Sequence, residues 1–298
     1  MSSADARWIA SDGVRLHVVA RGAGPDVVLL HGFTGSSESM AEVADGLADR
    51  FHTLSVDLIG HGKSDAPRDP ALYRMERCVR QLAGVLDTVV ARRAHLLGYS
   101  MGGRVALALC AARPERIASA LLVGASAGIA DAAARAARRR EDAALAERIE
   151  RDGVPAFVEA WMARPLFASQ QRRLSETARA AARAQRLACG AHALAYALRG
   201  MGAGAQAPLH ERLSALRLPV CLAVGEEDAK FRAIAAELAA RLPDARVVML
   251  PAAGHAAHLE NPAAFQRIAH SFFEQVEADA RSAPGRLDSH RQPREVNP

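Results

Sequence analysis

Residues 94–110 read AHLLGYSMGGRVALALC, which places a short apolar strand, a Gly-x-Ser-x-Gly turn and a helix in immediate succession. The small residues Gly98 and Gly102 allow a sharp, strained turn from strand to helix, and such a turn raises the hydroxyl of Ser100 above the edge of a sheet. The same five residues in an isolated loop would carry little information. Their position between a strand and a helix makes Ser100 a candidate nucleophile or base.

Strands and helices alternate on both sides of this turn. Strands are predicted at residues 7–10, 14–20, 27–30, 52–56, 94–97, 117–123, 220–224 and 246–250. Helices are predicted at residues 38–50, 72–91, 101–112, 231–241 and 262–277. This alternation predicts an α/β fold, in which a mainly parallel, eight-stranded sheet is covered by helices on both faces.

The alternation stops in the middle of the chain. Residues 130–200 contain several helical stretches and no convincing strand. We therefore predict a core of residues 1–127 and 208–278, interrupted by a helical cap insertion at residues 128–207. From Asp279 onward Pro, Arg and Ser occur without apolar periodicity, which predicts a disordered tail at residues 279–298.

The net charge of +5 lies in the cap insertion. Residues 128–205 hold 13 arginines and 8 acidic residues, so the rest of the chain is balanced. Scattered arginines and an aromatic content of 4% argue against a nucleic-acid partner. Most of these arginines are expected on a solvated helical surface, with a few available for a binding site.

The sequence also predicts a cytoplasmic protein that does not enter a membrane. Residues 1–7 lack the basic and apolar pattern of a secretory signal, and no run reaches the roughly 18–20 apolar residues of a membrane helix. The four cysteines are widely spaced and form no metal-binding pattern, so no metal site is expected: Cys78, Cys110, Cys189 and Cys221.

Two more catalytic candidates follow the serine in the chain. Asp228 and His255 each come directly after a predicted strand, at the sheet edge where loops form an active site. In folds built around such a turn, the chain order is serine, acid, histidine. This order favours Asp228 over Asp57, whereas Glu226 and Glu227 stay open as rival acids.

A reactive serine of this kind also needs donors for a developing negative charge. The backbone N–H of Met101 lies at a helix N-terminus, and the N–H of Phe33 follows an earlier strand, so both are candidates for an oxyanion hole. His31 directly follows that strand, which favours a structural role in the loop. His258 lies three residues beyond the candidate base, but no carboxylate partners indicate a metal pair.

Several motifs together resemble one family. They are GYSMGGR at 98–104, RRRED at 138–142, PLFAS at 165–169, LRGMG at 198–202, DAKF at 228–231 and GHAAHLENP at 254–262. With the turn, the HGF loop and the Ser-Asp-His order, they resemble the 2-succinyl-6-hydroxy-2,4-cyclohexadiene-1-carboxylate synthases of the α/β-hydrolase superfamily over most of residues 25–277. The resemblance implies an α/β-hydrolase fold with a helical cap.

It also implies a lyase of menaquinone biosynthesis that works without a cofactor. The implied substrate is 2-succinyl-5-enolpyruvyl-6-hydroxy-3-cyclohexene-1-carboxylate, from which pyruvate is eliminated. Ser100, deprotonated by His255 and oriented by Asp228, would remove a proton α to the succinyl ketone. The N–H groups of Phe33 and Met101 would hold the enolate oxygen.

That substrate carries three carboxylates, which require fixed cations, and arginine pairs bidentately with carboxylates. Arg104 lies one helical turn after the serine and faces the same side. By resemblance, Arg138 and Arg186 of the cap are further substrate-binding residues. Arg139 and Arg140 stay open as rivals of Arg138.

Tyr99 and Trp161 also match residues that line the site in this family. Ordinary packing would explain Trp161 about equally well, whereas Tyr99 adjoins the candidate base.

A hydrolase is the main alternative. A carboxylesterase, a thioesterase or a carbon–carbon bond hydrolase would use the same three catalytic residues, since a fold does not fix a reaction. Arg104 and the cap arginines favour the lyase, because an enzyme for neutral esters needs no such cations. The expected partner is a small tricarboxylate rather than a nucleic acid or a membrane. A monomer fits the sequence, which leaves the oligomeric state open.

Overall fold

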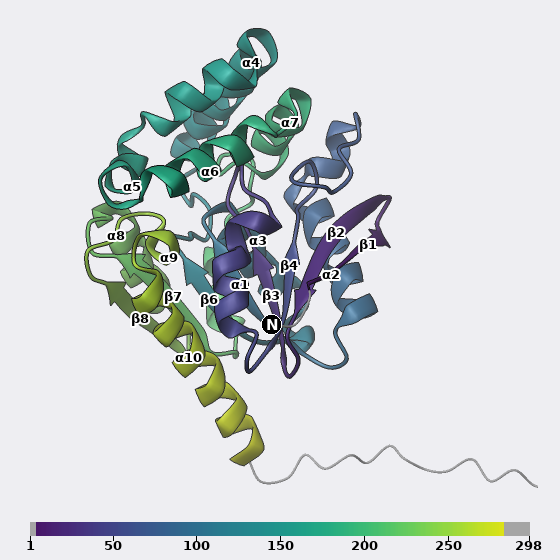
Figure 1. Ribbon diagram of the computed structural model, residues 1–298, viewed down its shortest axis with the longest axis vertical. Coiled ribbons are helices and arrows are strands. Elements are labelled where there is room, and N and C mark those ends of the chain that lie inside the picture. Colours follow the sequence, from purple (N-terminus) through teal and green to yellow (C-terminus); the bar gives the residue numbers. More distant parts are fainter. Residues whose placement is uncertain (1–3, 283–298) are drawn as a thin grey trace, which may run out of the picture.

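The computed structural model describes residues 4–282 of the chain, and an eight-stranded sheet lies at its centre (Figure 1). The strand order is β1-β2-β4-β3-β5-β6-β7-β8. Strand β2 pairs antiparallel with β1 and β4, and all other neighbours pair in parallel. The strands are β1 (Asp5–Ser11), β2 (Val14–Arg21), β3 (Asp26–Leu30), β4 (His52–Val56), β5 (Ala94–Tyr99), β6 (Ile117–Val123), β7 (Val220–Gly225) and β8 (Ala245–Leu250). The predicted α/β class and the eight strands are confirmed.

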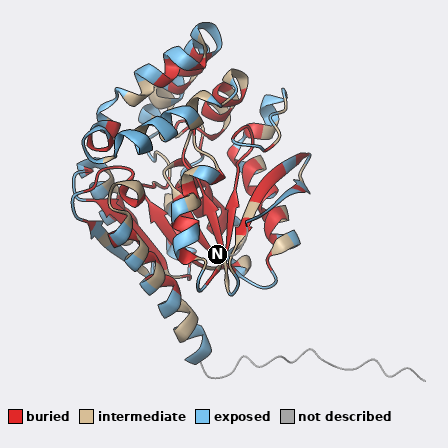
Figure 2. Ribbon diagram, in the orientation of Figure 1, coloured by how far each residue is buried: buried red, intermediate tan, exposed pale blue. Residues whose placement is uncertain are grey.

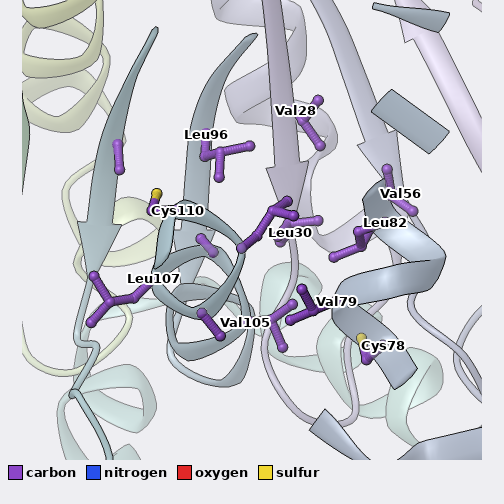
Figure 3. Close-up of a cluster of buried hydrophobic side chains, with 14 of the residues drawn as sticks. Val28, Leu30, Val56, Cys78, Val79, Leu82, Leu96, Val105, Leu107 and Cys110 are labelled. Carbon is purple, nitrogen blue, oxygen red and sulfur yellow. The ribbon is translucent and has the colours of Figure 1, made fainter. Parts of the chain in front are cut away.

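Helices cover both faces of the sheet, which explains why residues 27–30 of the central strand β3 are all apolar and buried. On β3, Val28 and Leu30 pack into one hydrophobic cluster, whereas Val27 and Leu29 pack into a second cluster on the opposite face. Figure 3 shows the first cluster between strands and two helices, and Figure 2 shows the buried centre of the sheet. The first face carries α2 (Met75–Val89), α3 (Met101–Ala112) and α8 (Ala229–Ala239), and the second carries α1 (Ala41–Leu47), α9 (Ala257–Glu260) and α10 (Pro262–Ser282).

Four further helices form a layer above the sheet, in the interval predicted for the cap (Figure 1). They are α4 (Ala132–Met162), α5 (Ala168–Arg173), α6 (Glu176–Leu187) and α7 (Ala191–Met201). Helix α4 is divided at Gly153, whose φ of 82° is not helical. The divided helix and α7 share a small hydrophobic cluster of their own, which includes Ile149, Phe157 and Leu194. This layer therefore has its own packing and lies over the edge that carries Ser100.

The end of α10 corrects the predicted start of the tail. The helix continues four residues beyond the predicted boundary, through Asp279 to Ser282. Local hydrogen bonds support this last turn, from Gln275 Nε2 to Asp279 Oδ1 at 2.7 Å and from the Ser282 hydroxyl to the Ala278 carbonyl at 2.9 Å. Alanine and arginine extend a helix by intrinsic propensity, without an apolar face. The rest of the predicted tail, residues 283–298, lies outside the described residues.

Long helices are present, but none has the character of a membrane span. Within residues 4–282, no helix is long and apolar enough to cross a bilayer.

Candidate active site

The backbone at Ser100 is strained, as the strand-to-helix turn requires. Ser100 has φ 51° and ψ −107°, an unfavourable conformation for a residue with a side chain. Its N–H donates to the Val123 carbonyl at 2.8 Å, which anchors the turn to β6. A Cβ at Gly102 would lie 2.2 Å from the Leu30 carbonyl oxygen, so only glycine permits this close approach to β3.

Ser100, His255 and Asp228 form a hydrogen-bonded chain. His255 Nε2 lies 3.0 Å from Ser100 Oγ, and His255 Nδ1 lies 2.8 Å from Asp228 Oδ2. The other carboxylate oxygen of Asp228 accepts from the Phe231 N–H at the start of α8, at 3.2 Å. His255 and Asp228 are only 4% and 9% exposed. The three candidates chosen from sequence are therefore assembled with the geometry of a proton relay.

The structure separates the rival acids from His255. Asp57 is buried beside His17 and accepts hydrogen bonds from two backbone N–H groups. Glu226 accepts from the Ala252 N–H at 3.1 Å, and Glu227 pairs with two arginines of α5. Each rival therefore has other partners, and Asp228 alone of the four contacts the imidazole.

The other two histidines that the sequence raised have packing roles. His31 Nε2 accepts from the Leu58 N–H at 3.0 Å, and this holds the loop after β3. The ring of His258 lies 4.5 Å from the Tyr99 ring, and burial, followed by the nearby His255, lowers its pKa to about 3. No group of three or more histidine, cysteine or acidic side chains within residues 4–282 could hold a metal ion.

A cavity of about 210 Å³ lies between the core and the cap, directly at Ser100. Both candidate oxyanion donors border it: Phe33 lies in the loop after β3, and Met101 is the first residue of α3. The N–H of a first helical residue has no acceptor in its own helix, so it is available to an anion. Trp161 of the cap also lines this cavity, with its ring centroid 5.5 Å from that of Phe33.

Cations from the core and the cap reach the same cavity. Arg104 comes from α3 and Arg138 from α4. Burial, and next the charge of Arg138, lowers the pKa of Arg104 to about 10. Arg139 and Arg140 are exposed, so the structure distinguishes Arg138 from its two neighbours.

Arg186 and Tyr99 line a different cavity, also of about 210 Å³. Phe33 borders both cavities, so the two spaces adjoin. The Arg186 guanidinium donates to the Ala182 carbonyl at 2.9 Å, and burial lowers its pKa. The structure therefore brings Arg104, Arg138 and Trp161 to the cavity at Ser100, whereas Arg186 and Tyr99 line the adjoining cavity.

Three residues of this region were missed as site residues. Lys230 lines the Ser100 cavity, and its place in the DAKF motif, two residues after Asp228, was an available signal. Asp142 pairs with Arg138 at 2.8 Å across one helical turn, and this spacing is readable in sequence. Gln206 bonds to Arg104 from 102 residues away, and no sequence signal indicates that contact.

Known proteins share this architecture along most of the chain. The family model described as alpha/beta hydrolase fold matches residues 25–262. A Bacillus subtilis (strain 168) protein, named provisionally as 2-succinyl-6-hydroxy-2,4-cyclohexadiene-1-carboxylate synthase, is 40% identical over 268 residues, which are 89% of this chain and 97% of that protein. The synthase of the same name from Enterobacter sp. (strain 638) is 35% identical over 240 residues, 80% of this chain and 88% of that protein.

Solved structures share the fold of this chain. MenH from S. aureus matches with a TM-score of 0.83 at 31% identity, and the match covers 87% of this chain and 98% of that chain. The enol-lactonase from Burkholderia xenovorans LB400 matches with a TM-score of 0.78 at 26% identity, covering 90% of this chain and 100% of that chain.

Proposed function

The chain belongs to the α/β-hydrolase family and, within it, to the 2-succinyl-6-hydroxy-2,4-cyclohexadiene-1-carboxylate synthases, and from this membership we propose that Ser100, His255 and Asp228 perform its chemistry. The synthase is a lyase of menaquinone biosynthesis, which eliminates pyruvate from 2-succinyl-5-enolpyruvyl-6-hydroxy-3-cyclohexene-1-carboxylate. The roles of individual side chains and backbone groups are our proposal.

Ser100 is the general base. Its hydroxyl proton passes to His255 Nε2 over the 3.0 Å hydrogen bond as Ser100 Oγ takes the proton α to the succinyl ketone. Asp228, 2.8 Å from Nδ1, fixes the tautomer in which Nε2 accepts, and it stabilises the imidazolium that forms. Since His255 and Asp228 are buried, water competes little for either group.

The N–H groups of Phe33 and Met101 hold the enolate oxygen. An oxyanion donor of this kind contributes about 3–4 kcal/mol to transition-state stabilisation. When the enolate collapses, its electron pair moves through the ring double bond to the ether oxygen and breaks the carbon–oxygen bond. The enolpyruvate that leaves takes up one proton and becomes pyruvate, His255 gives up the proton that it received, and the overall balance contains no water and no acyl-enzyme.

The cations around Ser100 receive the carboxylates of the substrate. Among the described residues, Arg104, Arg138 and Lys230 line the cavity at the base, and they come from three different elements. Arg186 lines the adjoining cavity and serves a part of the substrate that extends into it. The convergence of a Ser-His-Asp relay and several cations on one cavity is the observation that supports this assignment most strongly.

Pyruvate release tests the reaction against hydrolysis. The purified protein is incubated with the enolpyruvyl substrate, and pyruvate is measured with lactate dehydrogenase and NADH. The lyase assignment predicts pyruvate far above the uncatalysed rate and slow turnover of neutral aryl esters. The opposite pattern would indicate a hydrolase, the reaction class of the enol-lactonase neighbour. A cytoplasmic location and a monomeric state remain predictions.

A further inference from the structure

Gln206 is a buried neutral residue that contacts a cation of the site. It lies in the turn between α7 and the next core strand and is 1% exposed. Arg104 Nη1 donates to Gln206 Oε1 at 2.9 Å. Only the amide oxygen can accept from a guanidinium, so the chemistry fixes the orientation of the amide. Its Nε2 is buried and has no hydrogen-bond partner within residues 4–282.

The two arginines of the cavity therefore have different kinds of partner. Arg138 Nε donates to the Asp142 carboxylate at 2.8 Å, so its charge is partly balanced by a buried anion. Arg104 is held by a neutral amide, which directs the guanidinium without forming an ion pair, and the Asp142 carboxylate acts on Arg104 only as a nearby charge. A half-buried cation without an ion pair attracts an anion, because the charge of the anion offsets part of the free energy lost when the guanidinium left water.

One short turn, residues 202–206, contacts Arg104 directly and the partner of Arg138 as well. Asp142 Oδ2 also accepts from the Gly204 N–H at 3.3 Å, in the same turn that carries Gln206. The Gln206 N–H donates to the Gly202 carbonyl at 3.1 Å, which fixes the turn internally. Residues 202–206 thus connect Arg104 of the core with Arg138 of the cap, through one neutral contact and one charged contact.

We propose that Gln206 is a positioning residue that aims Arg104 at one substrate carboxylate without neutralising it. This inference rests on the proposed function, because it needs an anionic substrate in the cavity. A glutamate at position 206 would have almost the same shape, but it would form an internal salt bridge with Arg104. That salt bridge would compete with the substrate for the guanidinium.

The test compares Gln206→Glu with Gln206→Met and with a charge control, measuring kcat and KM for pyruvate release and the melting temperature. For Gln206→Glu we expect KM to rise at least tenfold, with a smaller change in kcat and no loss of melting temperature. Gln206→Met removes the directing hydrogen bond but keeps the charge of Arg104, so its loss falls on kcat at least as much as on KM. Gln171→Glu adds the same charge at an exposed position of the cap and keeps both constants.

The outcomes distinguish a wrong role for Gln206 from a wrong function for the protein. If the wild-type protein releases pyruvate but Gln206→Glu has an unchanged KM, the role proposed for Gln206 is wrong and the proposed function stands. A wild-type protein that releases no pyruvate would overturn the function, and this inference with it. If Gln206→Met does not fold, Gln206→Glu still tests the role of Gln206, because glutamate has nearly the same shape as glutamine.

Discussion

Arg104 and Arg138 line one cavity, although Arg104 belongs to core helix α3 and Arg138 to cap helix α4. Like charges in a poorly solvated space repel each other, and the charge of Arg138 contributes to the lowered pKa of Arg104. A carboxylate bound between them would relieve that repulsion. A substrate carboxylate would therefore contact residues of both the core and the cap at this pair.

Replacing Arg138 by alanine should weaken substrate binding. A hydrogen bond to a charged group is worth about 1.5–3 kcal/mol, so we expect kcat/KM to fall roughly 10- to 150-fold, mainly through KM. Arg139→Ala is the matched control, since Arg139 is the exposed neighbour on the same helix. Steady-state pyruvate assays on both variants measure the difference. Equal effects in the two variants would show that charge on the cap, rather than Arg138 itself, matters.

Asp228→Asn should lower kcat while the protein stays folded. Asparagine keeps the shape of aspartate, but its amide can donate to His255 Nδ1 and so favour the wrong tautomer. It also carries no negative charge to balance an imidazolium. We expect a loss of about 10²- to 10⁴-fold in kcat. Glu227→Gln controls for the loss of a neighbouring carboxylate and should keep kcat near that of the wild type. A strong loss in Glu227→Gln with little loss in Asp228→Asn would reverse our choice of acid.

Gly124→Ala should displace the catalytic imidazole. A Cβ at Gly124 would lie 2.8 Å from His255 Cε1, and the residue has φ +56°. A misplacement of about 1 Å at a reacting group can cost about 10²-fold in rate, so we expect kcat to fall by at least tenfold. Gly13→Ala is the control: its φ is +85°, but its Cβ would approach nothing closer than 3.8 Å. If both variants kept full activity, His255 would not need this space.

Acid should destabilise the fold through its buried histidines. Burial, followed by the nearby His31, lowers the pKa of His61 to about 3, and His258 behaves alike next to His255. In the unfolded chain these groups titrate near 6.5, so between pH 6.5 and 3 the unfolded state binds more protons and stability falls as pH falls. Each group contributes up to about 1.4 kcal/mol per pH unit.

Urea unfolding at pH 7.0, 6.0 and 5.0 measures this slope. His258→Phe keeps an aromatic ring beside Tyr99 and removes one titrating group, so the free energy of unfolding should depend less steeply on pH in this variant. An unchanged slope would mean that His258 does not stay neutral in the folded protein.

The sequence predicted those features that depend on local pattern. An Asp-Gly pair between two short strands favours a tight hairpin turn, and Asp12-Gly13, with φ of 44° and 85°, joins β1 to β2. The strand-to-helix turn at Ser100 and the order of acid and histidine led to the three residues that the structure joins by hydrogen bonds.

Features that depend on packing between distant segments were not predictable in the same way. The choice of Arg138 over Arg139 depends on the rotation of α4 over the sheet. The position of Arg186, which lines the adjoining cavity and not the one at Ser100, depends on how α6 packs over the core. The contact of Gln206 with Arg104 joins residues 102 positions apart, so no local pattern contains it.

The central claim is that Ser100 acts as a base in an elimination and forms no covalent intermediate. Intact-mass spectrometry of wild-type protein, quenched while it releases pyruvate from the enolpyruvyl substrate, tests it most directly, with Ser100→Ala as the inactive control. We predict steady pyruvate release from a wild-type protein of unchanged mass and none above background from Ser100→Ala. A mass increase of the wild-type protein that is absent from Ser100→Ala, or undiminished pyruvate release by Ser100→Ala, would contradict the account.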